Sequence, residues 1–306
     1  MAYAKPDSFM PACHIWPETP KFNPLLRALR ILQPNFNPSS LPLITTAGCL
    51  RRITTFLTRG PRTERLDLEL RAGTLFVGRW ESDELLDRHM GYGKQFEGGV
   101  QRYGPGLAGS ASSHVVAGYE IGGLQMGVQV EVDAFECDCH SHARLLARHG
   151  EDSVAKKRLS GGRFDILSGV EEEEEDDAAE SMTRVGAQLP LACAVEIKTR
   201  RRTNEADYPY LPQLYFQQTP RVFFAVRDGR FFRRGSMEMR DETDELVKWE
   251  GANQRLLGRL VALLKMIMAE ARKRGDGCKM ALVLEGGPEG RAVLYGRQGE
   301  ELVSDL

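Results

Sequence analysis

Three acidic residues and one lysine occupy alternate positions in two apolar segments of the chain. Glu131 and Asp133 lie in a segment of alternating valines, and Glu196 and Lys198 lie in a second apolar segment. Side chains alternate between the two faces of a β-strand, so residues two positions apart point the same way. If the two segments pair as strands, three carboxylates and one ammonium group meet on one patch.

Such a patch is typical of metal-dependent phosphodiester hydrolysis. Clustered carboxylates repel one another without a cation, and their hard oxygen atoms favour Mg²⁺ or Mn²⁺. Two such ions can hold the attacking and leaving oxygens, while a neighbouring lysine contacts the phosphoryl oxygens. The pattern is therefore that of a restriction-nuclease-like acid…acid-x-lysine site. The simpler alternative is an exposed strand face with alternating charge. The apolar flanks of both segments weaken this alternative but leave it open.

The elements that would position these residues indicate an α+β fold. We expect a mixed β-sheet core, arranged as two packed sheets and flanked by helices. The expected strands are residues 74–77, 128–135, 192–199 and 220–226, with a C-terminal hairpin of 280–284 and 292–295. Residues 24–32 and 253–274 have the apolar spacing of amphipathic helices, and 48–58 fit a helix or a strand.

The chain is expected to form one domain over residues 45–306, preceded by an irregular segment over 1–44. A polar insertion at about 143–188 interrupts this domain, and it contains the acidic run Glu171–Asp177. We interpret the run as a solvated loop; the alternative is a segment that mimics nucleic acid or recruits a basic partner.

Composition excludes several classes of protein. The chain has 306 residues, a net charge of −2 and 42% hydrophobic residues, which is enough apolar material for a core and excludes wholesale disorder. We expect neither a membrane span nor a signal peptide, because no apolar run is long enough and prolines interrupt residues 1–20. The expected location is the nucleus, with the cytoplasm as the alternative.

Several segments, in order and spacing, resemble the decapping exoribonuclease (DXO-like) family. Gln213 stands seven residues before Pro220, as the glutamine of that family stands before its proline. The resemblance covers about residues 45–300 and is carried by residues 50–55, 73–77, 90–97, 127–134, 195–199, 213–228, Trp249 and 285–289.

The resemblance implies a role for individual residues of this chain. The carboxylates around the metal ions would be those of Glu97, Glu131, Asp133 and Glu196, with the backbone carbonyl of Ile197 as a further ligand. Lys198 and Gln213 would orient the scissile phosphate and the attacking water, and Glu97 would share in catalysis. Members of the family remove incomplete or atypical RNA 5′ ends, including unmethylated caps, triphosphate and NAD, and some then degrade the RNA 5′→3′.

Three departures from the family pattern leave alternatives open. The family's early arginine motif, which contacts RNA, has no convincing match in residues 1–45, where Arg27 and Arg30 fit a solvated helix face better. Lys94 occupies an apolar position of the motif that leads to Glu97, and Glu120 is a rival for that role. Pro209 and Pro212 would shorten the helix that carries Gln213, which places Gln213 in its first turn. A weakened or inactive site is the corresponding alternative.

Two further clusters are candidate binding sites. Cys137, Cys139, His140 and His142 could bind zinc, but each like pair has one intervening residue, so an incidental loop is favoured. Phe223–Phe224 are expected in the core, whereas Phe231–Phe232 are expected to be more open. The basic residues around these pairs are candidate RNA contacts, namely Arg227, Arg233 and Arg234.

The sequence thus predicts a divalent-metal-dependent phosphohydrolase that acts at RNA 5′ ends in RNA quality control. One alternative is a catalytically weak or inactive protein that stabilises an XRN-class 5′→3′ exoribonuclease, as a fungal nuclear member of the family does. A third is a DNA nuclease with the same metal site. The preferred 5′ end and the presence of exonuclease activity are not specified by these residues.

The acidic run generates a first prediction. Residues 171–180 contain eight acids and no apolar anchor beyond two alanines, so they bury little surface. Replacing them with a Gly/Ser linker should leave the melting temperature and the turnover of 5′-modified RNA nearly unchanged. A collapse of either quantity would mean that the run packs on the body of the protein or acts in its site.

Overall fold

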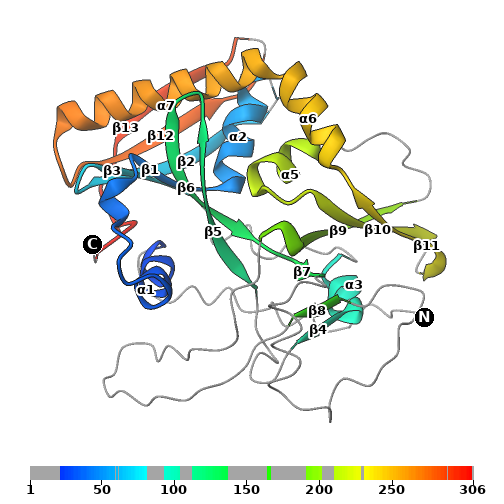
Figure 1. Ribbon diagram of the computed structural model, residues 1–306. Helices are drawn as coiled ribbons and strands as arrows, with labels where there is room; N and C mark the ends of the chain where they lie inside the picture. Colours follow the sequence, from blue (N-terminus) through cyan, green and yellow to red (C-terminus); the bar gives the residue numbers. More distant parts are fainter. Residues whose placement is uncertain are drawn as a thin grey trace.

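The structure is a computed structural model, and Figure 1 shows the arrangement of its elements. It describes residues 21–304, except for 59, 61, 81–92, 104–111, 137–163, 167–190, 202–209, 229–230 and 288. The motif Cys137–His142, the acidic run and residues 90–92 therefore lie outside the described residues. No helix in the described part is long and apolar enough to cross a membrane.

A mixed seven-stranded sheet forms the larger half of the fold. Its strands are β1 (Leu43–Thr46), β2 (Glu64–Arg71), β3 (Thr74–Arg79), β5 (His114–Ile121), β6 (Leu124–Glu131), β12 (Lys279–Glu285) and β13 (Arg291–Gly296). Their order is β13-β12-β2-β3-β1-β6-β5. Strand β1 runs parallel to β3 and β6, and the other neighbours are antiparallel.

A second, four-stranded sheet carries the predicted Glu-x-Lys segment. Its strands, in the order β11-β10-β9-β7, are β11 (Phe231–Asp241), β10 (Arg221–Asp228), β9 (Ala194–Arg201) and β7 (Ala134–Phe135). Strands β4 (Gln101–Tyr103) and β8 (Phe164–Ile166) form a separate parallel pair. The predicted α+β fold with mixed sheets is confirmed.

Helices flank both sheets. They are α1 (Asn23–Leu32), α2 (Ala47–Leu57), α3 (Gly93–Val100), α5 (Leu211–Gln217), α6 (Thr243–Ala252) and α7 (Gln254–Arg274), with 3₁₀ turns at Pro38–Ser40 and Leu191–Cys193. In Figure 1, α2 and α7 lie over one face of the large sheet and α1 lies at its other side. The predicted helix over 24–32 and the long helix over 253–274 are both confirmed.

Helix α2 is the element that the sequence left open between helix and strand. The Thr46 side chain accepts a hydrogen bond from the backbone N–H of Cys49 (3.1 Å), which satisfies one of the free donors at the start of a helix. Its apolar residues Leu50 and Ile53 are fully buried against the sheet, with α7 packed alongside. The cap and the apolar face together explain why this segment is helical.

Helix α3 packs on the smaller sheet through one aromatic residue. The Phe96 ring is fully buried, with its centroid 6.1 Å from that of Phe223 and 4.4 Å from that of Phe232. Phe232 is therefore buried, and the expectation that its pair is open was wrong for this ring. The reason is that Phe96 covers it. This packing fixes the next residue of α3, Glu97, beside β9.

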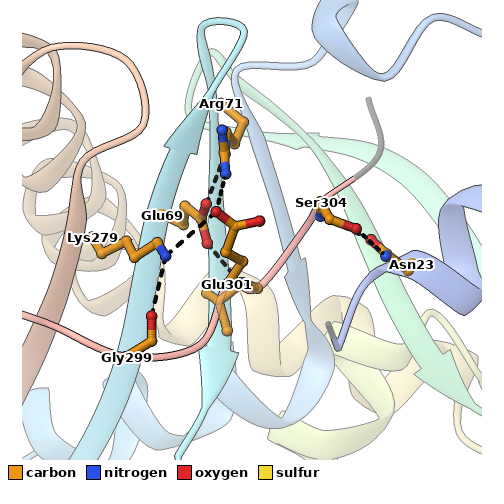
Figure 2. Close-up of polar contacts among 8 residues, drawn as sticks. Asn23, Glu69, Arg71, Lys279, Gly299, Glu301 and Ser304 are labelled. Atoms are coloured by element: carbon orange, nitrogen blue, oxygen red, sulfur yellow. Dashed lines mark hydrogen bonds and ion pairs between the residues drawn. The ribbon is translucent and has the colours of Figure 1, made fainter. Parts of the chain in front are cut away.

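The C-terminal segment is fastened to the large sheet by a buried carboxylate (Figure 2). Glu69 on β2 is fully buried, and it accepts hydrogen bonds from Arg71 Nε (2.7 Å) and from the backbone N–H of Leu302 (2.6 Å). Ser304 exchanges two hydrogen bonds with Asn23 at the start of α1. The two ends of the described chain thus meet on the face of the sheet covered by α1.

This fastening generates a second prediction. Glu69→Ala should lower the free energy of unfolding by about 2–3 kcal/mol, because it leaves the Leu302 N–H without its acceptor and removes one of the two carboxylates that pair with Arg71, the other being Glu301. The matched control is Glu285→Ala, which removes an exposed pair with Arg291 and should cost less than about 1 kcal/mol. Urea unfolding measures both. Equal losses would contradict the role assigned to Glu69.

Candidate functional site

The predicted site residues meet at the free edge of β9. Strand β7 has only two residues, and they pair with Ala194 and Val195, so no described strand pairs with β9 on that side beyond Val195. There the backbone N–H of Ile197 donates to Asp133 Oδ2 (2.7 Å). The N–H and C=O of one strand residue point the same way, so the Ile197 carbonyl also faces this edge.

Glu196 is the hub of a hydrogen-bond network on one face of β9. Its side chain is buried, and its Oε1 accepts from Lys198 Nζ (2.5 Å) and from Gln213 Nε2 (2.7 Å). Gln213 Oε1 in turn accepts from Arg51 Nη1 (2.8 Å). Strand β9, the first turn of α5 and helix α2 each contribute to this network, which links the small sheet to two helices.

Glu97 approaches the same edge from α3, on the opposite face of β9. If Gly93 carried a side chain, its Cβ atom would lie 3.7 Å from Glu97 Oε1 and 3.7 Å from Thr199 Oγ1 of β9. The Glu97 carboxylate is therefore close to β9. Helix α3 holds it there through Phe96, whose ring packs against the apolar face of the sheet. Glu97 and Glu196 thus reach the edge from two sides, with Asp133 between them.

Burial and neighbouring negative charge, in that order, determine the electrostatics of Asp133. Burial of Asp133, together with the charges of Glu196 and Glu97, raises its pKa well above the usual range. The Ile197 N–H and Lys198 act in the opposite direction and do not cancel the rise. Without a cation the cluster therefore favours a protonated Asp133.

The donor chemistry at this edge fits a hard divalent cation. Asp133, Glu196 and the Ile197 carbonyl offer oxygen atoms, the ligands that Mg²⁺ and Mn²⁺ prefer. Among the described residues, no three His, Cys, Asp or Glu side chains lie close enough together to hold a metal ion. In this structure Glu196 Oε1 is engaged by Lys198 and Gln213, and Asp133 Oδ2 by Ile197.

The structure places the other predicted metal ligand, Glu131, less centrally. Strand β6 ends at Glu131, whose side chain is exposed and whose cross-strand neighbour is His114. Its backbone carbonyl accepts from Gln217 Nε2 (3.3 Å) on α5. The rival glutamate, Glu120, pairs with Gln125 near the turn of the same hairpin, about 20 Å along the strand from Glu131.

The predicted RNA contacts are only partly described. Arg227 aligns with Arg201 of β9, which is three residues beyond Lys198. Because three is an odd number, the side chains of Arg227 and Lys198 belong to opposite faces of the sheet. Arg233 and Arg234 lie in β11, and their side chains are outside the described part.

Sequence reasoning missed Arg51 and Gln101. Arg51 follows the buried Leu50 in α2 and donates a hydrogen bond to Gln213. The side-chain amide of Gln101 donates to the backbone carbonyl oxygen of Asp133 (2.5 Å). The adjacent arginines Arg51 and Arg52, in an amphipathic segment, were a pattern from which a role for Arg51 could have been predicted. No pattern in the sequence pointed to the second.

The crowded charge generates a third prediction. The folded protein holds the Asp133 proton more tightly than the unfolded chain, so this group's contribution to metal-free stability declines as pH rises from about 4 through the raised pKa. Asp133→Asn keeps an acceptor for the Ile197 N–H and removes the charge. We expect this variant to melt above wild type in EDTA at neutral pH, and to lose the stabilisation that Mn²⁺ gives wild type.

Thermal unfolding with and without Mn²⁺, at about pH 5 and pH 8, measures both effects. Glu120→Gln is the control, because it removes one exposed carboxylate from β5 of the large sheet, away from the site. If wild type and Asp133→Asn respond equally to Mn²⁺, Asp133 is not a ligand.

Comparison with known proteins places this geometry in a family and a fold. Residues 12–293 match a family model described as a domain of unknown function, DUF8563. No curated protein matches the chain. Among solved structures, S. pombe Rai1 in complex with 3′-FADP matches with a TM-score of 0.56 and 14% identity, over 92% of this chain and 78% of that one.

Two further structures agree. C. albicans Rai1 in complex with pU5-Mn²⁺ matches with a TM-score of 0.57 and 14% identity, covering 90% of this chain and 74% of that one. K. lactis Dxo1 in complex with manganese matches with a TM-score of 0.50 and 7% identity, covering 94% and 74%. The expected resemblance to the decapping exoribonuclease family is confirmed as a likeness of fold. The chain belongs to the DUF8563 family, and its fold is that of Rai1 and Dxo1.

Proposed function

We propose that the protein is a divalent-metal-dependent phosphohydrolase that acts at RNA 5′ ends. The observation that carries this proposal is the network of Arg51, Gln213, Glu196 and Lys198 beside the crowded Asp133. It is supported by the fold, which is shared with a Rai1 bound to pU5-Mn²⁺ and a Dxo1 bound to manganese.

The proposed metal ligands are Asp133, Glu196 and the Ile197 carbonyl, with Glu97 and Glu131 completing the set for a second ion. A bound divalent cation would supply positive charge to the phosphoryl group and favour ionisation of water. It would also remove the repulsion that raises the pKa of Asp133. A bound cation would therefore explain why oxygen donors gather at this edge, and it would neutralise their unfavourable negative charge.

Lys198 is the proposed contact for the scissile phosphate. Its ammonium group bonds to the buried Glu196 at 2.5 Å, so its position is fixed before a substrate arrives. Two of its three donor positions remain for phosphoryl oxygens. Placing this charge where negative charge develops stabilises the transition state more than the ground state.

Gln213 and Arg51 are proposed to orient the water and the departing 5′ group. The Gln213 amide is held at both ends, by Glu196 and by Arg51, which fixes the orientation of its oxygen and nitrogen atoms. The Arg51 guanidinium uses one of its five donors on Gln213, so others are available for phosphate oxygens. Arg51 would therefore bind the outer phosphates of a triphosphate, cap or NAD end.

Two variants test the catalytic assignment and form the fourth prediction. Lys198→Ala should reduce the release of the 5′ group by about a hundredfold to a thousandfold, because one preorganised donor to the phosphate is lost. The control is Lys248→Ala, which removes an exposed lysine of α6 that pairs only with Glu245 among the described residues. That control should keep wild-type turnover.

The assay measures the 5′ product from otherwise identical RNAs that end in triphosphate, unmethylated cap or NAD, with Mn²⁺. A DNA strand of the same sequence is included. If wild type releases nothing from any RNA, the non-catalytic interaction protein is the better account. If wild type cleaves the DNA instead, the DNA nuclease is the better account. Equal turnover of wild type and Lys198→Ala would place the site elsewhere.

A further inference from the structure

An exposed arginine follows Lys198 on the same face of β9. Side chains alternate along the strand, so Glu196, Lys198 and Arg200 share one face, and the first two belong to the site described above. Arg200 is exposed, and no carboxylate of the described residues forms an ion pair with it. Its Cζ atom lies 5.6 Å from the centroid of the Phe224 ring.

A second arginine lies over the same ring. Arg240 of β11 places its Cζ atom 4.9 Å from the Phe224 centroid, and the Tyr210 ring meets Phe224 edge-on at 5.0 Å. Only 5% of Phe224 is exposed, so these neighbours cover it. We call Arg200, Phe224 and Arg240 the arginine shelf.

The shelf keeps a net positive charge. Arg240 pairs with Glu238 at 2.8 Å, and the pKa of Glu238 is lowered first by its hydrogen bond from Arg240 and further by the charge of Arg200. One carboxylate thus faces two guanidinium groups. Arg240 is partly neutralised by this pair, whereas Arg200 keeps its charge directed to solvent.

The chemistry of Arg200 suits the backbone of a nucleic acid strand. A guanidinium stacked on an aromatic ring leaves its planar fork of N–H donors free to bind phosphate oxygens. Residues two apart on a strand have Cα atoms about 6.6 Å apart, which is comparable to the spacing of consecutive phosphates in an extended single strand. Arg200 therefore lies one phosphate step beyond Lys198.

We propose that the arginine shelf binds the RNA backbone next to the reacting 5′ end, with Arg200 on the phosphate that follows the one at Lys198. The ligand is single-stranded RNA, recognised through its phosphates without base specificity. Only the identity of the phosphate at Lys198 rests on the proposed function. The shelf would make affinity increase with the length of the RNA beyond its first nucleotide.

The test is the dissociation constant of a 5′-monophosphorylated single-stranded RNA, measured by fluorescence anisotropy in EDTA over a range of salt concentrations. Arg200→Ala should bind about threefold to fivefold more weakly, and the slope of log Kd against log salt should fall by about 0.7. Arg200→Lys should keep that slope and lose part of the affinity, since charge remains without the planar fork. A 5′-mononucleotide should bind wild type and Arg200→Ala equally.

Arg272→Ala is the matched control, because it removes an exposed arginine at the far end of α7 from the small sheet (Figure 1). It should bind like wild type. An Arg200→Ala protein that matches this control in affinity and slope would overturn the shelf. So would an equal loss for the mononucleotide, which would move Arg200 to the first phosphate.

These outcomes are separable from those of the proposed function. RNA binding that depends on Arg200, without release of any 5′ group, would retain the shelf and reject the hydrolase. Hydrolysis that requires Lys198, with the length dependence of RNA binding unaltered in Arg200→Ala, would retain the hydrolase and reject the shelf.

Discussion

The crowding of carboxylates at the free edge of β9 is the constraint on which the site depends. Burial of Asp133 raises its pKa, and the charges of Glu196 and Glu97 raise it further. A buried cluster of this kind costs free energy in the folded protein unless protons or cations neutralise it. The Lys198 ammonium group and the neutral amide donors of Gln213 and Ile197 supply part of the compensation.

The edge arises because the chain enters strand β7 only at Ala134, opposite Val195 of β9. Asp133, the residue before β7, contacts β9 through its side chain instead: its Oδ2 accepts the hydrogen bond of the Ile197 N–H. Helix α5 then joins the two sheets, because Leu214 packs in the core of the small sheet while Phe216 packs in that of the large one. A hydrogen bond from the Tyr119 hydroxyl to the Phe216 carbonyl (2.9 Å) fixes the end of α5 on β5. Gln213 is therefore positioned by both halves of the protein.

Much of this arrangement was predictable from local sequence patterns. The alternation around Glu196 and Lys198 predicts a strand, and the apolar spacing of residues 257–268 predicts the buried stripe of α7; both are confirmed. The chemistry at Asp133 followed from the same alternation, although the strand β6 ends two residues before it. Local periodicity carries these features because it depends only on neighbouring residues.

The long-range features were not predictable in this way. Arg51 contacts Gln213 across 162 residues of sequence, and Gln101 contacts Asp133 across 32. Patterns among neighbouring residues therefore do not predict either contact. Glu131 and Asp133 appear equivalent in the sequence, yet the end of β6 leaves the first exposed beside His114 while the second turns to β9. Strands β5 and β11 also escaped notice, because the first carries a polar exposed face and the second is rich in charge.

The most direct test of the central claim is the location of Mn²⁺ in crystals of the protein, by anomalous scattering. The account predicts a peak at the free edge of β9, within about 2.0–2.3 Å of carboxylate oxygens of Asp133 and Glu196 and of the Ile197 carbonyl. A protein without a peak there, or with its only peak at the cysteines and histidines of residues 137–142, would contradict it.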